Sequence, residues 1–428
     1  MKNKRRFYSI FAVILLLVLT TALAGCGNTN RSSGSSKDGK VTLTFSMWDT
    51  LDPNKTDFIQ EFQKKYPNIK IKLINIPNDY SQKIHSMLIG GTAPDVILSW
   101  EADVNGFAKN GAIDPLDSYI KKTEAFNMND FIPAVSELNK SLESTGGKVY
   151  GLPWCYATEF LYYNKDMFDK AGVPYPNENW TWKDYEAAAK KLTIRNGSET
   201  TQWGTDAISF PGIWYSMAGS AGDDIVRNGK LDLKDGLKKA LEFQNQLTNV
   251  DKVSPQPSSG GQVADLFAAG KAAMTRQGSW YTLGYAKNDF NWDMAPLPKD
   301  ERQYASLHTG FFTINSASKH KAEAWKFIEF MMSKQGQTLL SKQYHNPSAE
   351  KSVMAEGAYK STGEHGPSNW DTFDKTADAG RFGYVLLNPT VTDDLVNDFN
   401  SVLLGQKKID DVINKDVPAA QKKLNEDK

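Results

Sequence analysis

The sequence predicts an α/β fold in which the strands of mostly parallel sheets alternate with helices. Strand-like and helix-like hydrophobic patterns follow each other from Val41 onward. The 428 residues are enough for about two domains with buried cores, and 40% hydrophobic and 23% charged residues are typical of a globular protein. The formal net charge is zero, with 50 basic and 50 acidic residues, so charge gives no support to nucleic-acid binding.

The first part of the chain predicts the order strand, helix, strand, helix, strand, which is typical of a parallel sheet with helices on its faces. Alternation of apolar and polar residues marks the strands, and apolar residues three or four apart mark the helices. The predicted elements are a strand over 41–48, a helix with Phe58, Ile59, Phe62 and Tyr66 on one face, a strand over 69–74, a helix over 80–89 and a strand over 95–99.

Later segments continue this pattern. Residues 160–163 are strand-like, and Thr181 with Asp184 has the spacing of a capping box before a helix that reaches Leu192. Ser318 is expected to cap a helix that runs to about residue 332, and residues 393–424 are expected to be largely helical.

The N-terminus predicts an export signal. Positive charges in residues 1–6 precede an apolar run over 7–19 and small residues over 20–25, and the run is too short for a spanning helix. We therefore expect a signal peptide over 1–25. Residues 26–40 are rich in Ser, Gly and Asn, and they predict a flexible tether before the folded part.

Histidine usage and motif content predict no metal site and no cofactor. The two cysteines are Cys26 and Cys155, and we expect Cys155 to be a buried, inert thiol. The five histidines show no metal-ligand spacing, and the chain has no phosphate-binding loop, dinucleotide fingerprint or hydrolase elbow. The sequence therefore predicts no cofactor, no metal and no catalytic residue.

Leu23-Ala24-Gly25-Cys26 resembles the lipobox of bacterial lipoproteins. The resemblance implies that Cys26 is acylated, for example with palmitate, and holds the protein on the extracytoplasmic face of the cell membrane. A Gram-positive surface is expected, because a lipid tether retains a receptor where no outer membrane does. An ordinary signal peptide with a chance cysteine is the alternative.

Four groups of stretches occur along the folded part of the chain. They are Ala93–Trp100 with Phe107–Gly111, Tyr150–Trp154 with Leu161–Phe168 and Thr181–Trp182, Phe267–Met274 with Gly278–Trp280 and Ala295–Pro298, and Ser318–Phe327. In this order and spacing they resemble the extracellular solute-binding proteins of sugar-importing ABC transporters. The resemblance implies a two-lobe fold of type II with a ligand cleft between the lobes, and a chain that crosses between the lobes near Trp154–Tyr156, near Thr309–Phe312 and near 355–370. It places the N-terminal lobe at 41–154 plus 312–355 and the C-terminal lobe at 155–310 plus 366–428.

A sugar site combines aromatic platforms for the apolar ring faces with planar polar groups for the hydroxyls. Trp100 and Asp103 follow the third strand and match the family's stacking Trp and hydroxyl-binding acid, although core packing and a helix-start acid are the alternatives. Glu101 is adjacent to both. Trp48 and Asp49 end the first strand. For Trp48 a core position is as open as a cleft position, and for Asp49 the alternative is a cap of the next helix.

Residues of the crossings and of the C-terminal lobe complete the candidate site. Trp280 matches the family's second stacking Trp, and the backbone N–H of Gly278 or Ser279 is a further candidate. The other candidates are Trp154 and Tyr156 on the first crossing, for which packing alone is an equal alternative, and Trp214 in an expected cleft loop. Arg381 is a candidate with a salt bridge as its alternative, and Gly310 is expected to be a hinge on the second crossing. Ala157 stands near the position of a carboxylate in the maltose-binding members, so maltose itself is not favoured; Glu159, the nearest acid, is expected to point elsewhere.

These patterns together predict a non-enzymatic, monomeric binding protein that closes on a sugar and delivers it to the transmembrane subunits of an ABC permease. Its only membrane attachment is expected to be the lipid. The alternatives are a solute-binding protein for a non-sugar solute and a secreted glycoside hydrolase that uses two acids of the same cleft.

Overall fold

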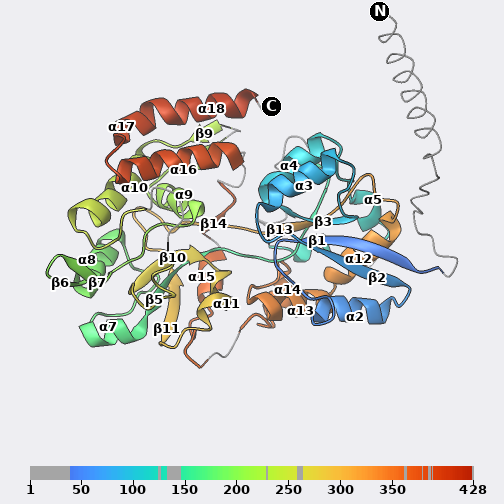
Figure 1. The fold of residues 1–428 in the computed structure, drawn as a ribbon, viewed down its shortest axis with the longest axis horizontal. Coiled ribbons are helices and arrows are strands. Elements are labelled where there is room, and N and C mark those ends of the chain that lie inside the picture. The colour runs from blue at the N-terminus through green and yellow to red at the C-terminus, as the bar shows by residue number, and fades with distance from the viewer. Residues whose placement is uncertain are drawn as a thin grey trace, which may run out of the picture.

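The computed structural model describes residues 39–123, 127–132, 146–227, 230–257, 264–360, 364–377, 379–383, 387 and 389–426. Cys26, the expected signal peptide and nearly all of the expected tether lie outside this part of the chain. The described elements form two bodies that lie side by side (Figure 1). No described helix has the length and the unbroken apolar character needed to span a bilayer.

The first body is built on a five-stranded sheet with the order β2-β1-β3-β13-β4. Strand β1 pairs in parallel with β2 and β3, whereas β13 runs antiparallel to β3 and β4 because it returns from the second body. The strands are β1 (Val41–Met47), β2 (Ile69–Asn75), β3 (Val96–Trp100), β4 (Leu152–Pro153) and β13 (Gly310–Ile314). The helices are α2 (Asp57–Lys65), α3 (Tyr80–Ile89), α4 (Glu101–Lys109), α5 (Asp117–Ile120), the 3-10 helix η1 (Met128–Asp130), α12 (Lys321–Met331), α13 (Lys334–Tyr344) and α14 (Lys351–Met354).

The second body contains a three-stranded sheet with the order β10-β5-β11, in which β5 is antiparallel to both neighbours. The α/β class is confirmed and the parallel arrangement holds for β2, β1 and β3, but the expectation of a mostly parallel sheet is wrong for this body. The reason is that β5 leads away from the junction of the two bodies while β10 and β11 lead back to it. The three strands are β5 (Glu159–Asn164), β10 (Met274–Gly278) and β11 (Trp292–Pro296).

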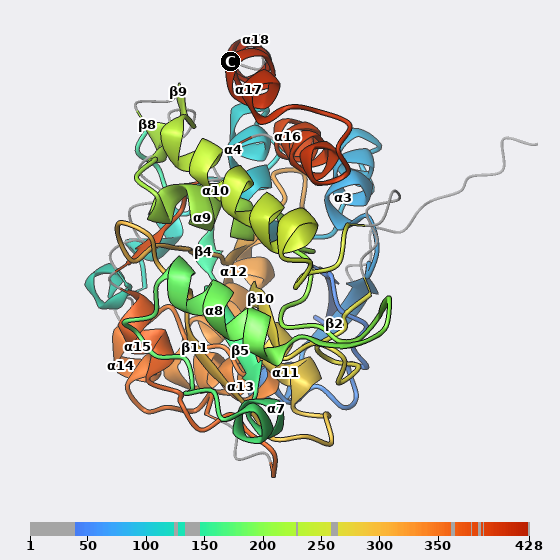
Figure 2. The ribbon, with the colours of Figure 1, turned by 90° about the vertical axis from the view of Figure 1, so that its left-hand side faces the viewer.

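Helices and three short strand pairs surround this sheet. Helix α8 packs on β5 and β10 through a shared apolar cluster and lies in front of the sheet in Figure 2. The helices are α7 (Lys165–Ala171), α8 (Trp182–Leu192), α9 (Pro211–Ser220), α10 (Asp235–Asn245), η3 (Gln246–Val250), α11 (Tyr281–Tyr285), α15 (Thr372–Ala377), α16 (Pro389–Leu403), α17 (Ile409–Asp411), η5 (Val412–Asp416) and α18 (Val417–Glu426). The strand pairs are β6 (Ile194–Asn196) with β7 (Glu199–Gln202), β8 (Ile225–Arg227) with β9 (Lys230–Asp232), and β12 (Ala305–Ser306) with β14 (Gly380–Arg381).

Helix starts show which local signals the sequence carries. The capping box at Thr181 and Asp184 is confirmed: the Thr181 side chain accepts the Asp184 N–H, and the Asp184 carboxylate accepts the Thr181 N–H. The prediction that Ser318 caps the next helix is wrong, because α12 begins after His320. The Ser318 hydroxyl instead donates to Asp95 at 2.7 Å and accepts the His320 N–H at 3.0 Å.

Two antiparallel chain segments connect the bodies. Ala157 and His308 exchange backbone hydrogen bonds of 3.0 and 2.9 Å, and β4 pairs with β13 through Pro153 with Phe311 and Leu152 with Phe312. The pairing holds the two segments in register at the junction. The third expected crossing, near 355–370, lies only partly within the described residues, and the exact lobe boundaries stay a prediction.

Candidate functional site

Three tryptophans gather at the carboxyl ends of β1 and β3. Trp48 and Trp100 are stacked, with ring centroids 4.1 Å apart and an interplanar angle of 12°, and Trp154 meets Trp48 edge-on at 5.4 Å. The two strands are parallel neighbours, so their ends meet at one edge of the sheet. Trp100 is 38% exposed and Trp154 only 6%. The site therefore offers a flat aromatic face, backed by a second ring, at the sheet edge.

Asp49, Tyr344 and Gly310 adjoin this tryptophan cluster. Burial raises the pKa of Asp49, and the Tyr344 hydroxyl beside it opposes the shift. The Tyr344 ring also packs edge-on against Trp154 at 4.7 Å. Gly310 faces Trp100 across the β3–β13 pair, and a Cβ there would lie 2.4 Å from the Trp48 ring. Glycine is needed here because the ring occupies the space of a side chain, and the hinge role of Gly310 stays a prediction.

Asp103 is directed into its own lobe. It is 4% exposed, accepts a hydrogen bond from the Ser81 hydroxyl and lies 3.5 Å from His85 Nε2. The hydrogen bond to Asp103 raises the pKa of His85. Both carboxylate oxygens therefore have protein partners on α3, and a ligand hydroxyl would have to share them.

Glu101 is connected to the second body through His308. His308 Nδ1 lies 3.4 Å from Glu101 Oε1, and His308 Nε2 lies 3.3 Å from Glu159 Oε1. Burial alone lowers the pKa of His308, but hydrogen bonds and charge from the two carboxylates outweigh it and raise the pKa to about 9. The imidazole is therefore protonated at neutral pH and carries a positive charge between two acids.

Trp280 lies next to His308. Its ring meets those of His308 and Phe210 edge-on, at 5.2 and 4.9 Å. Gly278 leaves the space that this ring occupies, since a Cβ there would lie 2.2 Å from it. The Ser279 N–H was expected to be available to a ligand, but it donates to the Thr158 carbonyl at 2.7 Å. The His308 ring therefore contacts both Glu101 and Trp280, the predicted second platform.

Three further predicted residues are Trp214, Tyr156 and Arg381. Trp214 is 1% exposed and packs against Phe399. It belongs to α9, so the expectation of a cleft loop is wrong: Pro211 starts a helix that turns Trp214 into the core. Tyr156 is fully buried, with its ring 6.3 Å from Phe373, as the packing alternative expects. Arg381 is exposed on β14, pairs with Ser306 in register, and donates to the Gly380 carbonyl at 2.7 Å.

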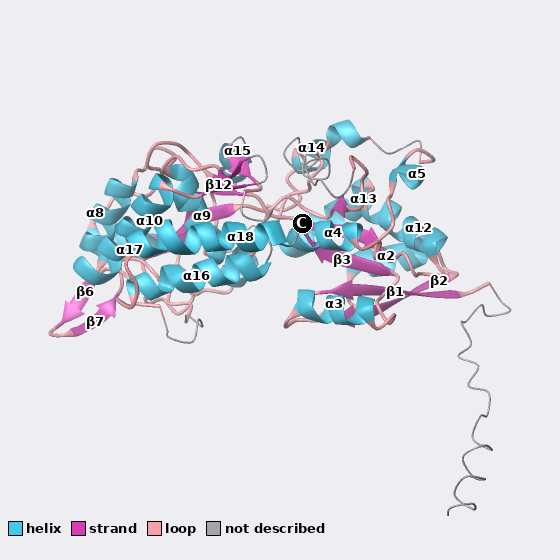
Figure 3. Ribbon diagram, turned by 90° about the horizontal axis from the view of Figure 1, so that it is seen from above, coloured by secondary structure: helices cyan, strands magenta, loops and turns pink. Residues whose placement is uncertain are grey.

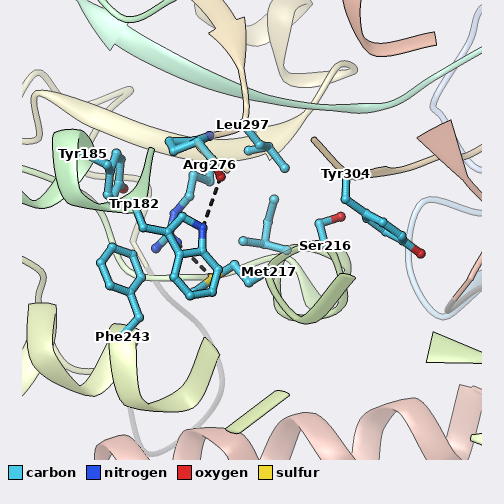
Figure 4. A pocket seen from close by; sticks show the side chains of 10 residues that line it. Trp182, Tyr185, Ser216, Met217, Phe243, Arg276, Leu297 and Tyr304 are labelled. Atoms are coloured by element: carbon cyan, nitrogen blue, oxygen red, sulfur yellow. Dashed lines mark hydrogen bonds between the residues drawn. The ribbon is translucent and has the colours of Figure 1, made fainter. Parts of the chain in front are cut away.

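A small pocket lies inside the second body, between α8, α9, α10 and the sheet (Figure 4). Arg276, 6% exposed, donates there to Gln244 Oε1 at 2.6 Å and to Met217 Sδ at 3.0 Å, and it stacks on the Tyr185 ring. None of the predicted site residues lines this pocket. We assign the pocket to packing of that body and the site to the junction.

Residue patterns did not reveal the roles of His308, Glu159 and Tyr344. His308 and Glu159 point toward each other although 149 positions separate them in the chain. The only available signal was His308 itself, a titratable residue in an otherwise apolar and small-residue crossing segment. Among the described residues, no group of three or more His, Cys, Asp or Glu side chains is placed to hold a metal ion.

Residues 49–338 match the family model of the bacterial extracellular solute-binding proteins. The chain is 30% identical over 338 residues to the arabinooligosaccharide-binding protein of Bacillus subtilis, covering 74% of each chain. It is 27% identical to an uncharacterized lipoprotein of Streptomyces antibioticus over 74% of this chain and 72% of that one. It also superimposes on an ABC substrate-binding protein of Listeria monocytogenes in complex with cycloalternan. The TM-score is 0.80, with 25% identity and coverage of 90% of this chain and 99% of that one.

Proposed function

The chain belongs to the bacterial extracellular solute-binding proteins, and from this membership we propose that it binds a neutral sugar or oligosaccharide between its two lobes for an ABC importer. The family consists of binding proteins, and we propose that this chain likewise carries out no chemistry on its ligand. The relatives named for arabinooligosaccharides and cycloalternan support the carbohydrate class.

The observation that carries the proposal is the Trp48–Trp100 stack. One exposed ring face, held by a second ring at 4.1 Å, suits the apolar face of a sugar ring. Two carboxylates adjoin this platform in the chain: Asp49 follows Trp48, and Glu101 follows Trp100. Stacking on apolar faces combined with acceptors for hydroxyl groups is the chemistry of carbohydrate recognition.

The proposed mechanism is lobe closure. A sugar on Trp100 would meet Trp280 of the other lobe only when the lobes come together, so the ligand would shift the population toward the closed form. The closed form would then dock on the transmembrane permease subunits. We further propose a monomer, to be checked by light scattering, with the acyl group on Cys26 as its only membrane attachment.

A thermal-shift screen tests the ligand class. Neutral pentose and hexose oligosaccharides should raise the melting temperature, whereas polyamines, iron chelates and inorganic anions should not. Trp100→Ala should remove the shift. Ile194→Ala is a matched control, since Ile194 is 43% exposed and lies on β6 at the outer end of the second body (Figure 3). Stabilisation by a charged solute alone would contradict the proposal, and so would cleaved oligosaccharides in the mixture.

Metabolic labelling with an alkyne-tagged palmitate tests the anchor. The wild-type protein should carry the label in the membrane fraction, and Cys26→Ala should carry none. An unlabelled wild-type protein would contradict the lipid attachment while leaving the sugar proposal unaffected.

A further inference from the structure

Three buried polar side chains form a continuous bridge across the junction of the lobes. Glu101 comes from the first turn of α4, His308 from the crossing segment, and Glu159 from the start of β5. They are 6%, 5% and 0% exposed. Each imidazole nitrogen faces one carboxylate, at 3.4 Å for Glu101 and 3.3 Å for Glu159. This Glu101–His308–Glu159 bridge therefore connects one lobe to the other through a single ring.

The two carboxylates differ in how well their oxygens are paired. The second oxygen of Glu159 accepts hydrogen bonds from the Ser216 hydroxyl and the Ser306 N–H. Oε2 of Glu101 is buried and has no hydrogen-bond partner among the described residues. A buried acceptor without a partner is costly, because a carboxylate oxygen gives up its bonds to water on burial. The bridge thus ends at Glu101, the residue that follows Trp100, in an acceptor with free capacity.

His308 is held in place by its surroundings. Its backbone exchanges two hydrogen bonds with Ala157, and its ring lies edge-on to Phe210 and Trp280 at 5.3 and 5.2 Å. Other titratable groups near the bridge are Cys155, which interacts electrostatically with Glu101, and Tyr304, which does so with Glu159 and Arg381. A ring fixed by the paired crossing segments and two aromatic neighbours can hold a carboxylate in one orientation.

We propose that Glu101 Oε2 accepts a hydrogen bond from a ligand hydroxyl, and that His308 is the positioning residue that orients Glu101 and ties it to Glu159 in the other lobe. This inference rests on the proposed function. One imidazolium between two carboxylates leaves a net negative charge, so the site favours neutral hydroxyl donors and rejects anionic sugars such as uronates. Glu101 thereby becomes a determinant of ligand charge as well as of affinity.

Calorimetric titration of the mature chain with arabinotriose, maltotriose and a galacturonic acid oligomer tests the inference. Glu101→Gln keeps the shape and removes the charge, so affinity for the neutral sugar should fall about tenfold or more, and discrimination against the uronate should weaken. Glu350→Gln is the matched control, because Glu350 is another partly buried glutamate outside the bridge. The affinity of this variant for the neutral sugar should stay within twofold of the wild-type value.

The pH profile separates positioning from mere structural support. Wild-type affinity should be constant from pH 6 to 8 and fall as the pH rises past about 9, where His308 loses its proton. His308→Gln should bind more weakly with no such fall. Glu159→Gln should move the fall to lower pH, because His308 then has one carboxylate fewer. A wild-type profile that is flat to pH 10 would contradict the role of His308.

The titration of His308 in the wild-type protein tests the inference even if the variants fail to fold. The His308 ring resonance should titrate near pH 9 and shift when a bound sugar takes up Glu101 Oε2; an unmoved titration would contradict the inference. If the wild-type protein binds no sugar, the proposed function and this inference both fail. If it binds sugar and Glu101→Gln equals wild type, this inference alone fails.

Discussion

Gly310→Ala should displace the aromatic platform without adding or removing any polar group. The new Cβ would lie 2.4 Å from Trp48 Cη2 and 3.1 Å from Trp154 Cδ1, whereas ordinary contacts are 3.4–4 Å. Trp48 would have to move by on the order of 1 Å, and over-packing of this kind costs about 1–3 kcal/mol of stability. Trp48 is stacked on Trp100, so the movement also disturbs the ring that we propose to bind the sugar.

Urea unfolding and calorimetry with arabinotriose measure the two effects. We expect Gly310→Ala to lower the free energy of unfolding by about 1–3 kcal/mol and to weaken sugar binding about tenfold, corresponding to about 1.4 kcal/mol. Gly106→Ala is the control: Gly106 lies inside α4, and a Cβ there meets no atom within 4 Å. That change should stabilise the protein by up to about 1 kcal/mol, because alanine favours the helix. Binding and unfolding of Gly310→Ala like those of wild type would contradict the predicted displacement of Trp48.

Three further predictions concern stability. The pKa of His308 is raised from 6.5 to about 9, so its protonation contributes fully to the free energy of unfolding below pH 6.5, and this contribution is lost as the pH rises through 9. Between pH 6 and 10, urea unfolding should show that wild type loses about 3 kcal/mol more of this free energy than His308→Gln. Trp214→Ala should cost about 3–5 kcal/mol but leave the sugar affinity of the folded protein within twofold by calorimetry, and a tenfold loss would return Trp214 to the binding site. Thr181→Ala should lower the unfolding free energy by about 1 kcal/mol through loss of the capping box, and no measurable change would show that the cap is redundant.

Local patterns predicted most of the elements because period and capping act over a few residues. The strands and helices of residues 41–100 follow directly from apolar spacing, and Thr181 with Asp184 forms the expected cap. Ser318 does not cap α12, because its hydroxyl donates to Asp95, which lies 223 positions away in the sequence. Spacing within one segment contains no information about such a partner.

The site was predictable where it depends on strand ends and not where it depends on pairing between lobes. Trp48 directly follows β1 and Trp100 ends β3, and these two strands are parallel neighbours in one sheet, which was sufficient to bring the rings together. The Glu101–His308–Glu159 bridge joins residues that lie 207 and 149 positions apart, and only the folded chain places them together. Trp214 shows the converse, since a Pro-Gly pair that resembles a loop is the first turn of α9.

Calorimetric titration of wild type, Trp100→Ala and Trp280→Ala with one neutral oligosaccharide shows whether the sugar is held between the two lobes. We expect a micromolar dissociation constant for wild type, about 8 kcal/mol of binding free energy. Each variant should lose affinity tenfold or more, because the sugar meets one platform from each lobe. Wild-type affinity retained in both variants would contradict the claim that the ligand is held between the two lobes.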